Sequence, residues 1–270
     1  MKTAAQKTAA LDPSAGDRLP YAGHLDDHTV MTRGGDLIQM IQVDGVAFET
    51  ADSETLNHMA AVRDVVMRGI ANSSLMLYCH VIRRQVTAEL SGAQPDGFVR
   101  DLDDAWQQQL RGKKLYINDM VLMLVRRPAQ GKIGFFDRLT KWGNGTRNSA
   151  ERLADQTREL RELDAARTNL LSALSRYGPR LLGRYHDANG TCSEPLEILS
   201  ALYNGEMQPV LEPTGDAGQY LPYKRISFGL DALELKGASA NTSRFGAIVS
   251  IKDYPAYTAP GMLDNLLRLP

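Results

Sequence analysis

The chain has 270 residues, of which 43% are hydrophobic, so it has enough apolar material for one large folded domain or two smaller ones. Its 31 basic and 32 acidic side chains nearly cancel, which excludes a global electrostatic attraction to nucleic acid or to an acidic surface. Two cysteines are too few for a disulfide framework, and no apolar run approaches the roughly 20 residues of a membrane-spanning helix. Together these properties predict a folded, cytoplasmic protein.

The first 20 residues are rich in Ala, Thr and Lys and have no apolar core of the kind that a signal peptide contains, so we expect a disordered tail at residues 1–20. The segment Met31–Thr50 then predicts a β-hairpin, because Gly34-Gly35 has the freedom at positive φ that a tight turn needs. Polar residues interrupt both faces of the strand after the turn. This mixed pattern favours an edge strand, with Met40 and Ile41 exposed to accept a strand or helix of a partner.

The next four elements alternate between helix and strand. Apolar residues at every third or fourth position predict helices at 53–70 and 98–110. Apolar runs predict strands at 75–82 and 114–127 that are buried on both faces, the first of them in the middle of a sheet. The order of elements predicts an α+β fold whose first subdomain, residues 21–128, is a ferredoxin-like α/β sandwich with helices on one face of its sheet.

Residues 129–148 are predicted to be a linker, because glycine, basic and aromatic residues gather there after Pro128. Its apolar side chains recur at helical spacing with lysine and arginine between them, which is typical of a segment that lies in a membrane interface or docks on a hydrophobic partner. The competing interpretation is an aromatic plug that packs on its own domain. The predicted contact residues are Ile133, Phe135, Phe136, Leu139 and Trp142.

The remainder, residues 149–270, is predicted to contain a long helix followed by a second small α/β subdomain. Leucines at close to heptad spacing predict a helix at 149–177, which Gly178-Pro179 ends. A strand at 181–186 and a helix at 193–203, capped by Ser193, follow. Short strands are predicted at 225–228, 232–236 and 245–252, the last two paired as a hairpin. The final residues resemble the start of a helix, so we expect the chain to be a truncated piece.

Motifs that carry catalytic chemistry are missing from the sequence. The Gly-Lys pairs, at Gly112 and Gly131, are not followed by Ser or Thr and lack the preceding glycine of a phosphate-binding loop. Neither Gly-x-Ser-x-Gly nor Cys-x-x-Cys is present. His24 and His28 are spaced as metal ligands on a helix would be, but a surface or capping role is favoured because closed metal sites need four ligands. We therefore expect no catalytic residue, cofactor or metal in this chain.

Two predicted strands end in arginine pairs, Arg83-Arg84 and Arg126-Arg127. If a helical crossover makes the strands parallel, the four guanidinium groups gather on one rim of the sheet and form a site for phosphates or acidic side chains. The simpler interpretation is that they are ordinary solvated strand ends. The rim is the basis of a second functional hypothesis, a nucleic-acid-contacting module.

Several motifs in a fixed order resemble the N-terminal region of the large cytoplasmic ATPase of type IV secretion and conjugation systems, the TrbE/CagE type of the VirB secretion ATPase family. The resemblance covers nearly the whole chain after the tail. Its most specific parts are Thr32-x-Gly34-Gly35-Asp-Leu with the Gly45-to-Phe48 segment, the strand end His80-Val-Ile-Arg83-Arg84, Tyr177-Gly178-Pro179-x-Leu-Leu-Gly183, Asn204-Gly205, Tyr220-Leu-Pro222, and Ser250-Ile-Lys252-x-Tyr254-Pro255-x-x-Thr258-x-Pro260-Gly261-Met262-Leu263-Asp264.

This resemblance implies a protein at the cytoplasmic face of the bacterial inner membrane that binds the short inner-membrane subunit and other inner-membrane components. It also implies hexamers, formed by the full-length protein through a C-terminal motor domain that uses ATP and magnesium and that is absent from this chain. The leading hypothesis is a non-catalytic docking domain, which anchors the motor to the translocation complex that exports protein or DNA. The alternative is a nucleic-acid-contacting module of a conjugation apparatus.

Overall fold

The computed structural model describes residues 15–46, 51–70, 74–86, 97–128, 149–237 and 242–253. The chain divides into two compact units, Met1–Pro222 and Tyr223–Pro270. Helices and sheets both contribute to the first unit, which confirms the predicted α+β class. The first unit extends through the predicted linker, and the boundary between the units falls after Pro222.

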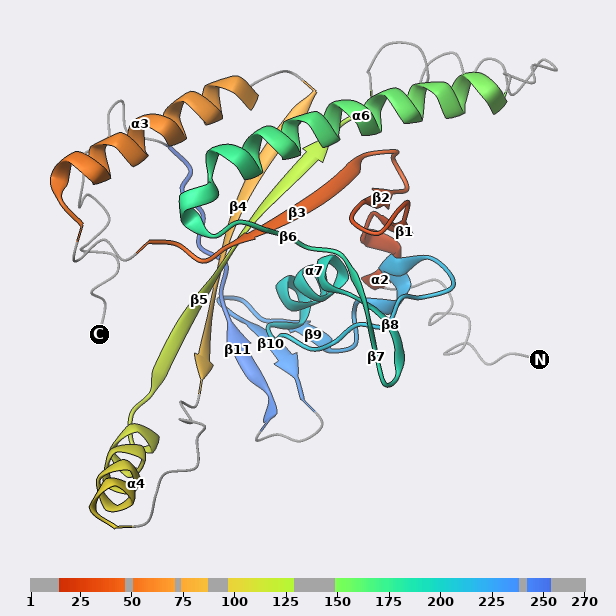
Figure 1. The fold of residues 1–270 in the computed structure, drawn as a ribbon. Helices are drawn as coiled ribbons and strands as arrows, with labels where there is room; N and C mark the ends of the chain where they lie inside the picture. Colours follow the sequence, from red (N-terminus) through yellow and green to blue (C-terminus); the bar gives the residue numbers. More distant parts are fainter. Residues whose placement is uncertain are drawn as a thin grey trace, which may run out of the picture. The chain divides into compact units, whose positions relative to one another are not determined.

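A six-stranded antiparallel sheet organises the first unit (Figure 1). The strand order is β1-β2-β3-β5-β4, and β6 pairs with the second half of β3. The strands are β1 (Tyr21–His24), β2 (Val30–Thr32), β3 (Leu37–Val43), β4 (Leu75–Val86), β5 (Leu115–Arg126) and β6 (Arg180–Leu181). The predicted hairpin joins β2 to β3, and Gly35 has a φ of 89° at its turn, in the region that favours glycine.

The strand β3 lies inside the sheet, so its prediction as an edge strand is wrong. It pairs with β5 on one side and with β2 and β6 on the other. Met40 and Ile41 are 0% and 1% exposed and therefore offer nothing to a partner. The polar Gln39 is buried as well, and its Nε2 donates to Asp164 Oδ1 at 2.9 Å.

The strand β4, which was predicted to be central, lies at an edge of the described sheet. Tyr78 is 44% exposed and Val81 is 56% exposed, although residues 75–82 are apolar on both faces of the strand. Most of β4 is only partly covered, whereas β5 is buried from Val121 to Arg126. The dense core therefore lies along β3 and the second half of β5.

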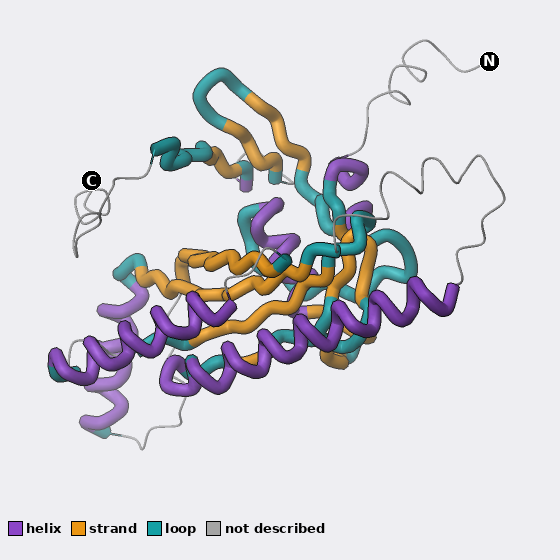
Figure 2. The backbone as a smooth tube through the Cα atoms, turned by 90° about the horizontal axis from the view of Figure 1, so that it is seen from above, coloured by secondary structure: helices purple, strands orange, loops and turns teal. Residues whose placement is uncertain are grey.

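Helices cover both faces of the sheet. On one face, α3 (Ser53–Ile70) and α6 (Ser149–Ala173) lie side by side (Figure 2), and Leu163 and Leu170 of α6 are fully buried against β3 and β5. On the other face, α7 (Glu194–Asn204) packs Leu196 and Leu199 against Met40. The short helices α2 (Ala15–Arg18) and α8 (Ala217–Tyr220) lie beside each other near β1.

The predicted ferredoxin-like arrangement holds for one helix only. β3 and β4 run parallel on either side of β5, so β3, α3 and β4 form a split β-α-β unit. The second helix, α4 (Phe98–Arg111), instead joins β4 to its antiparallel neighbour β5. It does not cross the sheet, and none of its side chains is buried.

Several later predictions are confirmed. The long helix ends at Ala173 and leads into a 3₁₀ turn, η2 (Ser175–Tyr177), after which Gly178 has a φ of 59°. The strand predicted at 181–186 is present in part as β7 (Arg184–Asp187), and it pairs with a strand that was not predicted, β8 (Gly190–Ser193), before α7. Ser193 caps α7, because its side chain accepts a hydrogen bond from the Leu196 N–H at 3.2 Å.

The second unit contains an antiparallel sheet of order β11-β10-β9 among its described residues. Its strands are β9 (Arg225–Phe228), β10 (Leu233–Lys236) and β11 (Arg244–Gly246). The predicted pairing of the last two strands is confirmed, with a shorter final strand. Across the described parts of both units, no helix combines the length and the hydropathy needed to cross a membrane.

Candidate interaction surfaces

The far halves of β4 and β5 leave the body of the sheet as a two-stranded ribbon. β3 pairs with β5 only from Met120 to Arg126, so residues 115–119 of β5 have residues 82–86 of β4 as their described partners. The helix α4 lies at the end of this ribbon, away from α3 and α6 (Figure 1). We call residues 82–86, α4 and residues 115–119 the arm.

The helix of the arm has an uncovered apolar face. Phe98 is 79% exposed, and Leu102 and Trp106 are each more than half exposed. These three residues are four positions apart and therefore lie on one side of the helix. Asp101 and Asp103 are at the borders of this side. An exposed apolar face with a polar rim is typical of an interaction site.

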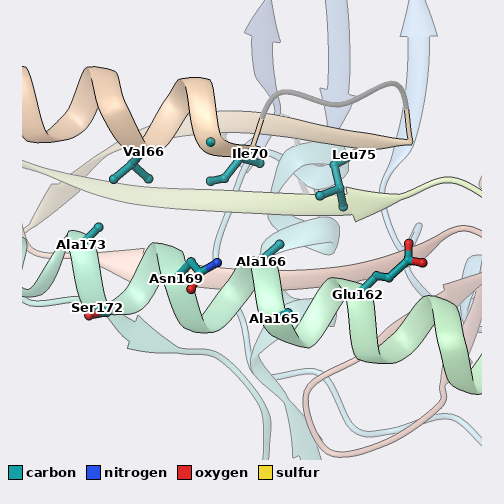
Figure 3. A pocket seen from close by; sticks show the side chains of 10 residues that line it. Val66, Ile70, Leu75, Glu162, Ala165, Ala166, Asn169, Ser172 and Ala173 are labelled. Atoms are coloured by element: carbon teal, nitrogen blue, oxygen red, sulfur yellow. The ribbon is translucent and has the colours of Figure 1, made fainter.

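A groove lies between α3 and α6, which we call the α3–α6 groove (Figure 3). Its volume is about 540 Å³. Its walls are mixed, since the polar side chains of Glu162, Asn169 and Ser172 line it together with apolar ones, and Figure 3 places side chains from both helices along it. They include Val66 and Ile70 of α3, Leu75 of β4, and Ala165, Ala166 and Ala173 of α6.

A smaller hollow of about 400 Å³ lies on the face of β4 and β5 opposite to this groove, and Met76, Met123 and Val125 line it. The rings of Tyr78 and His80 stack in it with centroids 6.2 Å apart. Burial lowers the pKa of His80, and its buried Nε2 has no hydrogen-bond partner among the described residues. The Thr32 hydroxyl, which also lines this hollow, donates a hydrogen bond to Asp36 Oδ2 at 2.9 Å.

The four arginines of the predicted rim do not come together. β4 and β5 are antiparallel, so Arg84 pairs with Ile117 whereas Arg126 pairs with Leu75. Nine residues of β4 separate these two positions, which corresponds to roughly 30 Å. The prediction of a single rim is wrong because α4 joins two adjacent antiparallel strands and is not a crossover between parallel ones.

Three of these arginines have partners within the chain. Arg126 is buried, and its Nη2 donates to Glu162 Oε2 at 2.7 Å. Arg84 pairs with Asp119 at 2.5 Å, and the Arg83 guanidinium lies 4.8 Å from the centroid of the Tyr116 ring. Arg127 is exposed beside the smaller hollow. Their arrangement gives no common anion site.

Two ionic clusters join the N-terminal strands to later parts of the first unit. Arg184 bridges Asp27 at 2.6 Å and Glu212 at 3.1 Å, and the bond from Arg184 lowers the pKa of Asp27. Arg33 binds Asp216 through two nitrogens at 2.6 and 2.9 Å, which lowers the pKa of Asp216. Because these guanidinium groups are already paired, we assign them a structural role.

The histidines of the N-terminal segment also have structural partners. His24 Nδ1 lies 2.9 Å from the Asp26 carbonyl oxygen, and its Nε2 lies 2.6 Å from Ser193 Oγ. Ser193 is fully buried and caps α7, so this Ser–His pair joins elements and is closed to a substrate. His28 Nδ1 lies 3.1 Å from the Leu182 carbonyl oxygen. Within the described residues, no three His, Cys, Asp or Glu side chains gather as metal ligands.

The predicted contact residues of the linker, Ile133, Phe135, Phe136, Leu139 and Trp142, lie outside the described residues. The apolar positions of α4 were visible in the sequence, but their exposure was not. The spacing of apolar residues identifies the apolar side of a helix. Whether another element covers that side depends on how the helix is connected to the rest of the fold.

Two family profiles match the chain. The type IV secretion system ATPase VirB4/TrbE N-terminal domain matches residues 28–133. The CagE, TrbE, VirB family, a component of a type IV transporter system, matches residues 180–270. The first match includes β3, β4, α4 and β5, and therefore the whole arm.

Curated relatives match almost the whole chain. The type IV secretion system protein virB4 of Bartonella henselae is 30% identical over 258 residues, which are 94% of this chain and 32% of the relative. The virB4 protein of Brucella suis and PtlC of Bordetella pertussis are each 29% identical over 256 residues, covering 92% of this chain and 30% of the relative. The chain thus spans about a third of the length of these relatives.

Proposed function

We propose that this chain, which belongs to the VirB4/TrbE family of type IV secretion system ATPases and corresponds to its N-terminal region, is a non-catalytic docking domain. In this proposal it holds the ATP-driven motor against the inner-membrane part of the secretion system on the cytoplasmic side. The longer family members then bind ATP and magnesium in the part that this chain does not span. The contact that forms hexamers lies in that part as well.

The observation that carries the proposal is the edge strand β4. It is 12 residues long and apolar on both faces over residues 75–82, and its outer edge has no strand partner among the described residues. Such an edge accepts an extended segment of another protein through backbone hydrogen bonds, while exposed side chains such as Tyr78 and Val81 contact the residues of that segment. We propose the short inner-membrane subunit as the protein that supplies the segment.

Nucleic-acid contact is not favoured by any described feature. That hypothesis rested on four guanidinium groups at one rim, and the antiparallel pairing separates them. The aromatic linker at 129–148 stays a second proposed contact to the membrane or to a partner.

Binding of the chain to inverted inner-membrane vesicles tests the proposal. Vesicles from cells that contain the membrane subunits of the secretion system should retain the chain, and vesicles without these subunits should not. Val81→Lys places a charge on the exposed edge and should lower recovery at least about fivefold, because charged side chains block strand addition. Val65→Lys, on an exposed position of α3, is the matched control and should bind like the wild type.

Equal recovery of Val81→Lys and the wild type would contradict docking at β4. Ser substitutions at Phe136 and Trp142 test the linker in the same assay and should weaken recovery. ATP hydrolysis by the purified chain, at a level that survives controls for contaminants, would contradict the non-catalytic part of the proposal.

A further inference from the structure

The helix at the end of the arm has a continuous apolar face. Phe98, Leu102 and Trp106 fall within about 80° of one another around α4, because an α-helix turns about 100° per residue. Val99 and Leu110 widen this face. None of the side chains of α4 is buried, and the helix lies away from α3 and α6 (Figure 1). The rest of the first unit therefore supplies no helix to cover this face.

Both long borders of the apolar face are acidic. Asp101 lies at one border and Asp103 at the other, whereas Arg100 and Arg111 lie on the opposite side of the helix. The Asp101 carboxylate has no ion-pair partner among the described residues. Asp103 Oδ2 accepts a hydrogen bond from the neutral Gln107 amide at 2.8 Å. Both carboxylates are thus available to cationic groups of a partner.

This charge pattern selects the class of partner. A helix that lies in a membrane interface has lysine and arginine beside its apolar face, where α4 has aspartate. Apolar residues four positions apart form a ridge that packs against a second helix. From Phe98 to Leu110 the face extends over 12 residues, or about 18 Å. It therefore suits an amphipathic helix of three to four turns with basic residues at both borders of its apolar stripe.

From this arrangement we infer that the apolar face of α4 binds a basic amphipathic helix, which is the cytoplasmic juxtamembrane segment of an inner-membrane protein. Segments that flank membrane-spanning helices on the cytoplasmic side are enriched in lysine and arginine, so they supply the charge that the borders of α4 require. Phe98 and Trp106 are the aromatic anchors of the contact. The source of the helix rests on the proposed function, whereas the contact itself does not use the β4 edge.

Fluorescence anisotropy with a synthetic peptide tests the contact in the absence of membranes. The labelled peptide is a helix of about 18 residues, with leucines at every third or fourth position and lysines at both borders of the leucine stripe. The wild-type chain should bind it. Trp106→Glu should bind it at least about tenfold more weakly, because aromatic anchors dominate such contacts. Trp106→Phe retains an aromatic ring and should bind within about threefold of the wild type.

A charge reversal tests the acidic borders. Asp101→Lys should weaken binding of the lysine peptide about fivefold at low salt and strengthen binding of a peptide with glutamates in place of the lysines. Asp103→Lys should act in the same way from the other border. Asp104→Lys makes the same charge change on the opposite side of α4 and should change the binding of either peptide much less. Circular dichroism checks that the variants fold.

Cross-linking tests the source of the helix. The chain, with benzoylphenylalanine in place of Leu102, is irradiated on inverted inner-membrane vesicles that contain the membrane subunits of the secretion system. Mass spectrometry of the product should identify a segment that adjoins a membrane-spanning helix and contains lysine or arginine. The same group in place of Val65, on an exposed position of α3, is the control and should not give this product.

Equal peptide binding by Trp106→Glu and the wild type would overturn the inference, as would equal effects of Asp101→Lys and Asp104→Lys. A cross-link from position 102 to lipid, to a second copy of the chain or to a segment without basic residues would also overturn it. Val81→Lys should bind the peptide like the wild type. A failure of docking at β4 would therefore leave this contact intact, and a failure of the peptide contact would leave docking at β4 intact.

Discussion

The strands β3 and β4 have exchanged the positions that their residue patterns predict. β3 has polar residues on both faces and is buried inside the sheet, whereas β4 is apolar on both faces over residues 75–82 and lies at an edge. The difference lies in where their partners come from. Gln39 of β3 donates to Asp164, and Gln42 accepts from Arg180, which are both more than 120 residues away in sequence.

This comparison shows that a polar residue in a strand is compatible with burial when a distant element satisfies its hydrogen bonds. Conversely, an apolar run is compatible with exposure when the strand outgrows its neighbours. β3 has 7 residues, and β4 and β5 have 12 each, so the longer strands extend beyond the body. The arm and its uncovered helix follow from that difference in length.

The largest expected effect is on the free energy of unfolding, when one side chain is shortened in each of the two strands. Met40→Ala in β3 should lower the free energy of unfolding by about 2–5 kcal/mol, because it leaves a cavity in a closed core. Val81→Ala in β4 should lower it by only about 0.5 kcal/mol, because this side chain is already mostly in water. Urea unfolding of the two variants measures both values. Equal losses would contradict the assignment of β3 to the body and β4 to the edge.

An intermediate effect is expected for the acidic partners of two arginines. Glu162→Gln leaves the buried Arg126 without its counter-charge and should cost about 1–3 kcal/mol. Asp119→Asn is the same chemical change on the arm, where Arg84 is exposed, and should cost about 0–1 kcal/mol. Urea midpoints compare the two variants at pH 7. A larger loss of stability for Asp119→Asn than for Glu162→Gln would contradict this prediction, because the ion pair on the arm would then contribute more to stability.

The sequence predicted the local elements well, because their signals are local. The turn at Gly35, the cap at Ser193 and the end of the long helix at Gly178 depend on a few neighbouring residues. The apolar side of α4 was equally visible. Each of these features is determined by backbone freedom, capping or periodicity within one or two turns of chain.

The arrangement of the candidate surfaces could not be predicted in this way. Whether β4 and β5 were parallel depended on whether α4 crosses the sheet, and both connections have the same local pattern. The direction of the strands determines where the arginine pairs lie, since the antiparallel ladder places Arg84 and Arg126 far apart. It also decided that α4 caps an arm and covers no part of the sheet.

The smallest expected effect concerns pH and His24, a partly buried histidine at the junction of β1 and α7. Burial lowers the pKa of His24 below its ordinary value, although the Asp26 carbonyl and Glu212 oppose the shift and Arg184 adds to it. In the window between the folded pKa and the ordinary value near 6.5, the unfolded chain binds more protons than the folded one. The stability from neutral His24 is therefore complete above about pH 6.5 and is lost as the pH falls toward the folded pKa.

His24→Gln removes this titration, so its free energy of unfolding should decline less than that of the wild type between pH 7 and pH 5. Glu197, whose pKa burial raises, contributes with the opposite sign but is present in both proteins and cancels in the difference. His58→Gln, on an exposed position of α3, is the control and should follow the wild type. Parallel pH profiles for His24→Gln and the wild type would mean that His24 binds protons equally in the folded and the unfolded chain. That result would contradict the lowered pKa of His24 in the folded chain.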